Sequence, residues 1–343
     1  AKGAIEANLP DPEVEGEFLA APPGEQNRWG AGISWGLDWP GVYSARKNLA
    51  KAESEVSLWK AKAEQRDLGI EARRLLLDYI LQAKQIKIIE SLILTTDTIS
   101  ELAIKANKGG EMTLLDLNKL RLEATALKAR LSAANDAKAQ AAASLAGIAG
   151  HDCTDLLEKM DKEFPSMSGI ETADMASMIA SSPQMREAHA MVKLADEEKR
   201  VASREALPGI NFGYKHAFED GNHFNGGSIG LSLPLFSSKG KMKAAKASRK
   251  AAEIAAEEIR INSETSAQSA LRRMNILNEE IKQVAPLLEG TDNQTILLKA
   301  YKAGVITLID YLNERNYFLE ATVQLLELRH AAANAVLDVL AVK

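Results

Sequence analysis

One internal repeat limits the possible folds of this chain more than any other feature. Residues 105–121 (KANKGGEMTLLDLNKLR) and residues 299–315 (KAYKAGVITLIDYLNER) are identical at eight of 17 positions, at an offset of 194 residues. Unrelated sequences of ordinary composition would match at about one position. The chain therefore consists of two copies of one unit, and each structural element is expected twice.

Short segments in each copy alternate between apolar and polar residues. This period of two predicts strands that have one apolar and one polar face. The expected strands span residues 9–21, 28–39, 208–219 and 227–236. The apolar faces carry Trp29, Ile33, Trp35, Phe212, Ile229 and Leu231. The polar face of the first strand carries Glu13, Glu15 and Glu17, which would line a water-filled lumen or form an ordinary solvated surface.

Long helical segments follow each pair of strands. The first is expected at residues 42–107, which is roughly 99 Å at 1.5 Å per residue. The second is expected at 238–303, with a kink or break at Pro286. The return helices, at 113–149 and 307–341, carry apolar residues at alternating spacings of three and four, which is typical of coiled coils.

The order of these elements predicts three parts. The first repeat covers residues 1–150, a less regular connecting segment covers 151–182, and the second repeat covers 183–343 and begins with a helix at 183–206. Shifted back by the repeat offset, that helix would precede residue 1. We therefore expect the natural chain to begin earlier, with a first helix and an export signal that are missing here.

The turns between the long helices carry the residues that the two copies share most closely. Gly110 and Gly304 follow the ends of the outgoing helices, where glycine permits a left-handed turn. Thr113 and Thr307 are placed to cap the return helices, with Asp116 and Asp310 at the third helical position. A well-formed hairpin is a sufficient explanation of this pattern, and a docking role is compatible with it.

Other kinds of chemistry find little support in the sequence. The net charge is −5, and the single cysteine, Cys153, can form neither an intramolecular disulfide nor a zinc cluster. The five histidines are scattered, and no nucleophile, base and acid come together. Six methionines between Met160 and Met191 suit soft metal ions, but their spacing fits no compact site and gap filling is the simpler interpretation. We expect no enzyme activity, no cofactor, no metal site and no nucleic-acid partner.

The strands themselves argue for a membrane barrel. Four strands of about this length could cross a bilayer, but four are too few to close a barrel, and open sheet edges are not tolerated in lipid. Three copies would supply twelve strands, an even number within the usual range. Trp29, Trp35 and Trp39 would then form an aromatic girdle, although a soluble sheet core is the alternative.

The order of elements, the paired hairpins and the repeated Gly-x-x-Thr-x-x-Asp turns resemble the TolC family of outer-membrane efflux channels. Residues 9–41 (LPDPEVEGEFLAAPPGEQNRWGAGISWGLDWPG) resemble its heavy-metal cation-efflux (CusC-like) type. The resemblance implies a mainly α fold with a small β part, in which long antiparallel coiled-coil hairpins adjoin a trimeric 12-stranded transmembrane β-barrel.

The same resemblance implies a function. The chain would be the outer-membrane subunit of a tripartite efflux system in a Gram-negative bacterium, with most of its residues in the periplasm. As a homotrimer, it would export metal cations or small toxic molecules passively, and its turns would dock a periplasmic adaptor that links it to an inner-membrane pump. The alternative is a soluble coiled-coil scaffold or a periplasmic adaptor.

Overall fold

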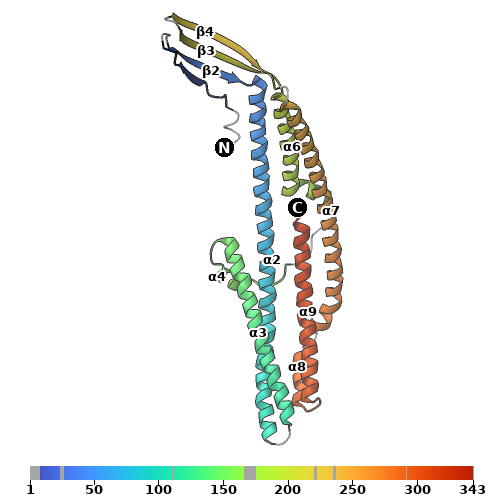
Figure 1. Ribbon diagram of the computed structural model, residues 1–343. Coiled ribbons are helices and arrows are strands. Elements are labelled where there is room, and N and C mark those ends of the chain that lie inside the picture. The colour runs from blue at the N-terminus through green and yellow to red at the C-terminus, as the bar shows by residue number, and fades with distance from the viewer. Residues whose placement is uncertain are drawn as a thin grey trace. The chain divides into compact units, whose positions relative to one another are not determined.

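The computed structural model describes residues 8–23, 27–109, 112–165, 175–219, 222–234, 237–290 and 292–342 (Figure 1). The chain divides into two compact units. The sheet unit comprises residues 1–64 and 179–262, and the helical unit comprises residues 65–178 and 263–343. Each unit draws on both sequence repeats, so the structural division runs across the repeats.

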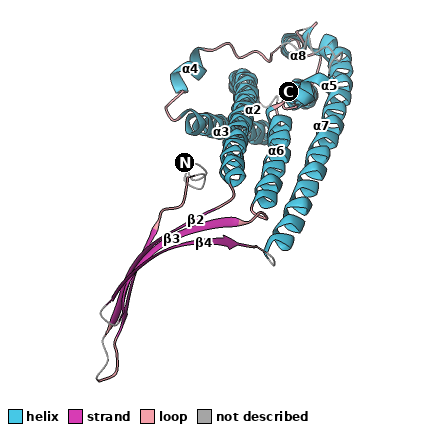
Figure 2. Ribbon diagram, turned by 90° about the horizontal axis from the view of Figure 1, so that it is seen from above, coloured by secondary structure: helices cyan, strands magenta, loops and turns pink. Residues whose placement is uncertain are grey.

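The sheet unit contains one antiparallel four-stranded sheet in the order β1-β2-β3-β4 (Figure 2). Its strands are β1 (Glu13–Leu19), β2 (Arg28–Leu37), β3 (Gly209–Glu219) and β4 (Asn222–Ser232). Each repeat contributes a hairpin, and β2 pairs with β3 to join the two hairpins. The apolar-polar alternation predicted these strands because each of them has one apolar face.

The strand boundaries differ from the expected ones at two places. β1 covers only the middle of the expected segment 9–21. β4 begins at Asn222, five residues before the expected start, because residues 222–226 pair with the end of β3 rather than forming a wide turn. Asparagine and glycine in this stretch suggested a loop, but ladder pairing with an existing strand outweighs their low strand propensity.

Three helical segments complete the sheet unit. They are the first part of α2 (Pro40–Lys108), all of α6 (Pro183–Arg204) and the first part of α7 (Ser237–Glu289). Figures 1 and 2 both show α6 between α2 and α7. Met185 and Ala188 of α6 pack on Ala256 of α7. Lys193 of α6 pairs with Glu55 of α2 at 2.6 Å.

The helical unit is built from two helical hairpins. The first joins the second part of α2 to α3 (Leu114–Ala149), and the second joins α8 (Asn293–Lys302) to α9 (Leu308–Leu340). The predicted heptads agree with the burial along α3 and α9. Buried heptad positions include Leu117, Leu120, Leu127, Ala134, Leu312, Leu319, Leu326, Ala333 and Leu337. The predicted heptads of α9 begin at Ile309, but Ile309 is exposed. Its neighbour Leu308 faces the core instead.

The outgoing helix of the second repeat is broken, but not at Pro286. α7 continues through the proline and ends at Glu289, where the Pro286 carbonyl accepts from the Gly290 backbone N–H at 3.3 Å. α8 then starts afresh. The Asp292 carboxylate caps it by accepting from the Thr295 backbone N–H at 3.1 Å.

The described part of the connecting segment covers residues 151–165 and 175–182. It contains two short helices, α4 (Thr154–Lys159) and α5 (Met175–Ser181). Leu157 of α4 is buried against Tyr79 and Ala141. Among the described residues, none of the helices combines the length and the apolar composition that crossing a membrane requires.

Candidate functional site

The turn from α8 to α9 is fixed by backbone hydrogen bonds that require a glycine. Gly304 has a φ of 69°, in the left-handed region that residues with a side chain rarely adopt. Its backbone N–H donates to the Tyr301 carbonyl, and the Val305 N–H donates to the Ala300 carbonyl, both at 3.0 Å. This pair of bonds is the Schellman motif, which satisfies the last carbonyls of α8 and reverses the chain.

Thr307 and Asp310 then start α9 with a reciprocal cap. The Thr307 hydroxyl accepts from the Asp310 backbone N–H at 3.2 Å, and the Asp310 carboxylate accepts from the Thr307 backbone N–H at 3.3 Å. The hydroxyl also donates to the carboxylate at 2.7 Å. The structure therefore forms the capping box that the sequence predicted here.

The turn from α2 to α3 is similar at its cap. Thr113 accepts from the Asp116 backbone N–H at 3.1 Å and donates to the Asp116 carboxylate at 2.7 Å. The Asn107 side-chain amide donates to the Met112 carbonyl at 2.8 Å and bridges the turn. Gly110 lies outside the described residues. Among the described turns, only the second shows the bond from the capping threonine's N–H to the aspartate.

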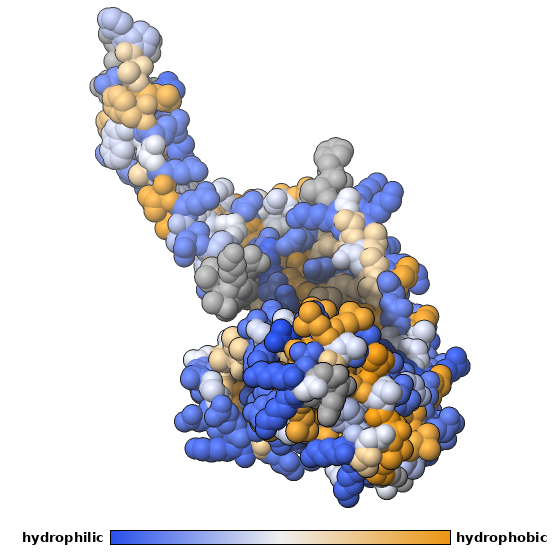
Figure 3. All heavy atoms as spheres, turned by 90° about the horizontal axis from the view of Figure 1, so that it is seen from below, coloured by the Kyte–Doolittle hydropathy of each residue, from blue (hydrophilic) through white to orange (hydrophobic). Residues whose placement is uncertain are grey.

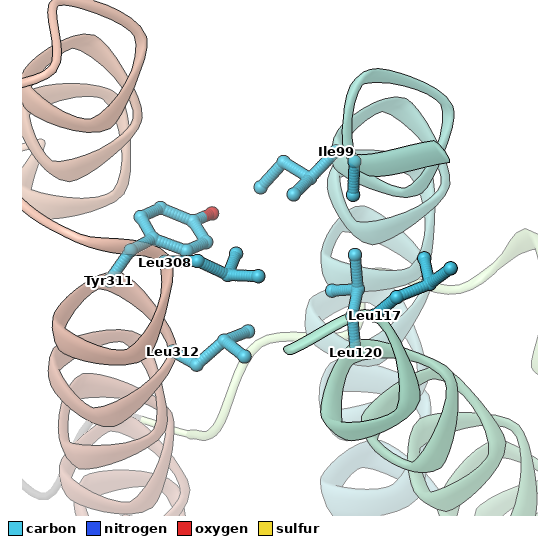
Figure 4. Packing of buried hydrophobic residues seen from close by; sticks show 7 residues of the cluster. Ile99, Leu117, Leu120, Leu308, Tyr311 and Leu312 are labelled. Carbon is cyan, nitrogen blue, oxygen red and sulfur yellow. The ribbon is translucent and has the colours of Figure 1, made fainter. Parts of the chain in front are cut away.

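The two turns are held together by one apolar cluster. Ile99, Leu117 and Leu120 of the first hairpin face Leu308, Tyr311 and Leu312 of the second (Figure 4). All six side chains are buried. The two turns therefore form one packed end of the helical unit, and not two independent loops.

The same end also exposes apolar residues. Figure 3 shows apolar side chains gathered on the near face of the helical unit, at the end where Figure 1 places the turns. We call Leu114, Leu115, Val305 and Ile309 the tip patch. Val305 is 75% exposed, and Leu114 and Leu115 are exposed by nearly two thirds. Exposed apolar clusters of this kind are typical of binding surfaces.

The pairing register of the sheet places all six predicted membrane-facing residues on one face. Trp35 lies opposite Phe212, which lies opposite Ile229, and Ile33 lies in the same alternation. Trp29 and Leu231 follow the same phase at other rungs. Most of this face is in solvent, and Ile229 is 79% exposed. The described residues of the sheet unit therefore leave this apolar sheet face largely uncovered.

The opposite face of the sheet is polar and rich in glycine. Lys215 of β3 reaches across β2 and pairs with Glu17 of β1 at 2.6 Å. It passes over Gly30, where an added Cβ would lie 3.3 Å from the lysine Cε. Arg28 and Glu219 form a second cross-strand pair at 2.8 Å. The acidic row predicted from the sequence is thus partly neutralised by β3.

An ionic network stands where the strands meet the helices of the sheet unit. Arg46 of α2 pairs at 2.9 Å with Asp38, which follows β2, and with Glu205, which precedes β3. Lys241 of α7 pairs with the same Glu205 at 3.0 Å. Partial burial would raise the pKa of Glu205, but hydrogen bonds from Arg46 and Lys241 outweigh it and the pKa is lowered.

Sequence reasoning missed one buried cation. Arg315 of α9 is only 2% exposed. Its guanidinium donates to the Thr96 hydroxyl of α2 and to the Glu123 carboxylate of α3, each at 2.7 Å. Arg315 therefore joins the second hairpin to both helices of the first. The repeat match between Arg121 and Arg315 was visible, but the periodicity did not distinguish a solvated arginine from a buried one.

The methionines that the sequence singled out lie in different surroundings in the part of the chain that the structure describes. Met185 is buried in the core of the sheet unit, Met160 packs near Leu157, and Met191 is exposed. Met167 lies outside the described residues. Among the described side chains, no group of three or more histidine, cysteine and acidic residues could hold a metal ion. Gap filling fits Met160 and Met185, whereas Met191 is exposed.

Known proteins share this arrangement. Residues 175–342 match a family model described as outer membrane efflux protein. A comparison with curated proteins finds no match. Among solved structures, a membrane protein from Pseudomonas aeruginosa is 16% identical, with a TM-score of 0.84 over 99% of this chain and 86% of that one.

Two further solved structures are named as channels. The CmeC outer membrane channel of Campylobacter jejuni is 15% identical, with a TM-score of 0.80 over 99% of this chain and 80% of its own. CusC, whose structures concern folding and transmembrane channel formation, is 16% identical, with a TM-score of 0.72 over 99% of this chain and 85% of its own. At these identities the likeness concerns the fold.

The match confirms the resemblance inferred from the repeated turns and sets aside the soluble scaffold and the periplasmic adaptor. The family consists of channel proteins rather than enzymes. Residues 175–342 therefore belong to the outer membrane efflux protein family, and the chain as a whole has the fold of solved outer-membrane channels.

Proposed function

We propose that this chain is one subunit of a homotrimeric outer-membrane channel that exports metal cations or small toxic molecules passively. The observation that carries the proposal is the sheet, whose apolar face is exposed and whose edges are β1 and β4. Such a face is stable against lipid, but lipid also requires every backbone N–H and C=O to be paired. A barrel made from several copies meets both requirements.

Three copies are the number that the strands favour. One chain supplies four strands, and three copies give twelve, which is within the range of outer-membrane barrels. In this assembly β4 of one subunit pairs with β1 of the next, and the apolar faces form one continuous band. Light scattering of the detergent-solubilised protein tests the number directly. A stable monomer or dimer would contradict it.

The facing of the sheet has its own test. Ile33 and Ser34 are neighbours on β2 but lie on opposite faces, because Ile33 pairs with Val14 and Ser34 with Glu13. A charged side chain on the lipid face costs about 2–4 kcal/mol at mid-bilayer when it is Arg or Lys, and less when it is Asp. We therefore expect Ile33→Asp and Leu231→Asp to lower the amount of protein in the outer membrane. The matched controls Ser34→Asp and Ser232→Asp should insert normally, and equal insertion of both sets would contradict the assignment.

We also propose that the tip patch docks a periplasmic adaptor, which couples the channel to an inner-membrane pump. Two observations support this role. The tip patch exposes Leu115 and Val305, and the turns that present it are fixed by the caps at Thr113 and Thr307. Three subunits would present six similar turns, which suits a collar of six adaptor copies or three adaptor pairs.

Docking and folding can be separated by surface substitutions. Val305→Glu and Leu115→Glu change exposed residues, so the trimer and its outer-membrane level should stay normal while export falls. Leu122→Glu is the matched control, because Leu122 is 71% exposed on α3 but does not belong to the turn. Susceptibility of the cells to metal salts and to drugs measures export and reveals which cargo is carried. Full resistance in the two turn variants would contradict the docking role.

A further inference from the structure

Two histidines that are seven residues apart meet across the hairpin of β3 and β4. His216 lies opposite Asn225, and His223 lies opposite Phe218, so the two imidazoles are diagonal neighbours on the apolar face. Nε2 of His216 and Nδ1 of His223 are 3.2 Å apart. The two rings stack with their centroids 5.3 Å apart. The two ring nitrogens therefore point toward each other from adjacent strands.

A hydrogen-bond chain determines which nitrogen of His216 is free. The Asn225 side-chain oxygen accepts from Nδ1 of His216 at 2.7 Å and from the Tyr214 hydroxyl at 3.0 Å. Because Nδ1 carries the proton, Nε2 has a free lone pair, and it is this atom that faces His223. Histidines that bind metals are commonly oriented in this way, by an oxygen that accepts from the second ring nitrogen.

Aromatic side chains restrict the two rings further. Trp29 of β2 lies against His216 at a centroid distance of 5.5 Å, and Phe218 lies against His223 at 5.1 Å. Trp29 and Phe218 also stack on each other at 6.0 Å. A pair of ligands held in place before binding loses less side-chain entropy when a ligand arrives.

We propose that His216 and His223 bind one divalent transition-metal ion, such as Cu²⁺ or Zn²⁺, at the end of the sheet near the turn between β3 and β4. Metal–imidazole bonds are about 2.0–2.1 Å long. Two such bonds at a tetrahedral or square angle place the nitrogens about 3 Å apart, which agrees with the observed separation. Water completes the coordination, and the inference rests on this hairpin alone, not on the cargo of the channel.

Binding requires a change of tautomer in His223 and a rotation of the two rings, because an ion bonded to both nitrogens at about 2.0–2.1 Å lies beside the line that joins them. In the metal-free hairpin, Nδ1 of His223 donates its proton toward Nε2 of His216. When the metal ion binds beside the line between the two nitrogens, the His223 proton moves to its own Nε2, and both nitrogens turn their lone pairs toward the ion. No proton is released and no oxidant is needed. His216 keeps its bond to Asn225 throughout.

Electron paramagnetic resonance with Cu²⁺ as the probe tests the site in the full chain in detergent. We expect one Cu²⁺ per chain at pH 7.5, with a spectrum that shows two nitrogen ligands. His216→Ala and His223→Ala should each weaken binding by at least about tenfold, and Asn225→Ala by about tenfold, since supporting residues typically contribute that much. His189→Ala is the matched control because His189 is an exposed histidine of α6.

A second measurement does not depend on the histidine variants. Cu²⁺ bound at this site lies beside Trp29 and should quench its fluorescence, so the quenching should largely disappear in Trp29→Phe. Circular dichroism confirms that each variant is folded. The proposal is overturned if the wild-type chain does not bind Cu²⁺, if either histidine variant binds as well as the wild type, or if His189→Ala abolishes binding.

Discussion

The turn from α2 to α3 and the turn from α8 to α9 are near copies in sequence, but they bury different residues. Leu114 and Leu308 occupy the same position in the repeat, and their exposed fractions are 63% and 6%. Both turns keep the cap from threonine to aspartate. The comparison shows that local capping residues determine where a helix begins, while tertiary packing decides which face of the helix is buried.

The arginines of the two repeats differ in the same way. Arg121 is exposed on α3, whereas Arg315 is buried on α9 between Thr96 and Glu123. The helices before the two turns differ as well. α2 runs without a break to Lys108, but the second repeat is interrupted between Glu289 and Asn293, so α8 packs on α9 through its own contacts. One of these is the ring pair Tyr301–Tyr311 at 5.4 Å.

The largest effect should come from exchanging the two arginines for alanine. Arg315→Ala leaves the Glu123 carboxylate and the buried Thr96 hydroxyl without their cation, and removing one partner of a buried ion pair costs about 3 kcal/mol. Arg121→Ala should change the free energy of unfolding by about 0.5 kcal/mol or less. Guanidinium unfolding of the detergent-solubilised protein gives both values. Equal effects would mean that the burial of Arg315 does not matter for stability.

The next effect concerns the paired leucines. Leu308→Ala opens a cavity in the cluster with Ile99 and Leu120, and a large-to-small change in a core costs about 2–5 kcal/mol. A site near the end of a helix relaxes easily, so we expect about 2 kcal/mol. Leu114→Ala should leave the unfolding midpoint nearly unchanged. If Leu114→Ala lowered stability more than Leu308→Ala, the assignment of Leu308 to the core and of Leu114 to the exposed face would be wrong.

Much of this fold could be predicted from the sequence because it depends on periodicity. The alternation in β2 and β3 predicted which residues share a sheet face, and the spacing of Leu319 and Leu326 predicted burial on α9. The caps at Thr113 and Thr307 could be predicted too, since a capping box involves residues only three positions apart. In each case the information is local or strictly periodic.

The parts that could not be predicted depend on contacts between distant segments. Arg315 is bonded to Thr96, 219 residues away. His216 and His223 meet only because β4 begins at Asn222, five residues before the expected start, which tightens the hairpin.

Replacing the two capping threonines with alanine should have a smaller effect on stability, and it compares the same two turns. Loss of an N-cap costs about 1 kcal/mol. Thr307→Ala removes the hydroxyl but keeps the backbone N–H that donates to Asp310, whereas both described bonds of Thr113 to Asp116 use the hydroxyl that Thr113→Ala removes. We therefore expect the Thr113 variant to lose more stability than the Thr307 variant, by a few tenths of a kcal/mol. Thermal unfolding of both variants, with Thr322→Ala on α9 as a control away from the cap, measures the difference.

The smallest effect concerns the break that distinguishes the second repeat from the first. Asp292 caps α8, and hydrogen bonds from the Thr295 side chain and backbone lower the pKa of its carboxyl below the ordinary 3.8. A lowered pKa in the folded state stabilises the fold at pH values above 3.8, and this contribution is lost as the pH falls through the folded-state value. Asparagine caps helices about as well but does not titrate. Wild type and Asp292→Asn should therefore be equally stable near pH 7, and the wild type should lose stability relative to the variant below about pH 4. Unfolding curves of the two proteins at matched pH give this difference directly, since every other titrating group is common to both. A constant difference across the acid range would show that the α8 cap does not depend on the charge of Asp292, and that the break is held by the packing of α8 on α9 alone.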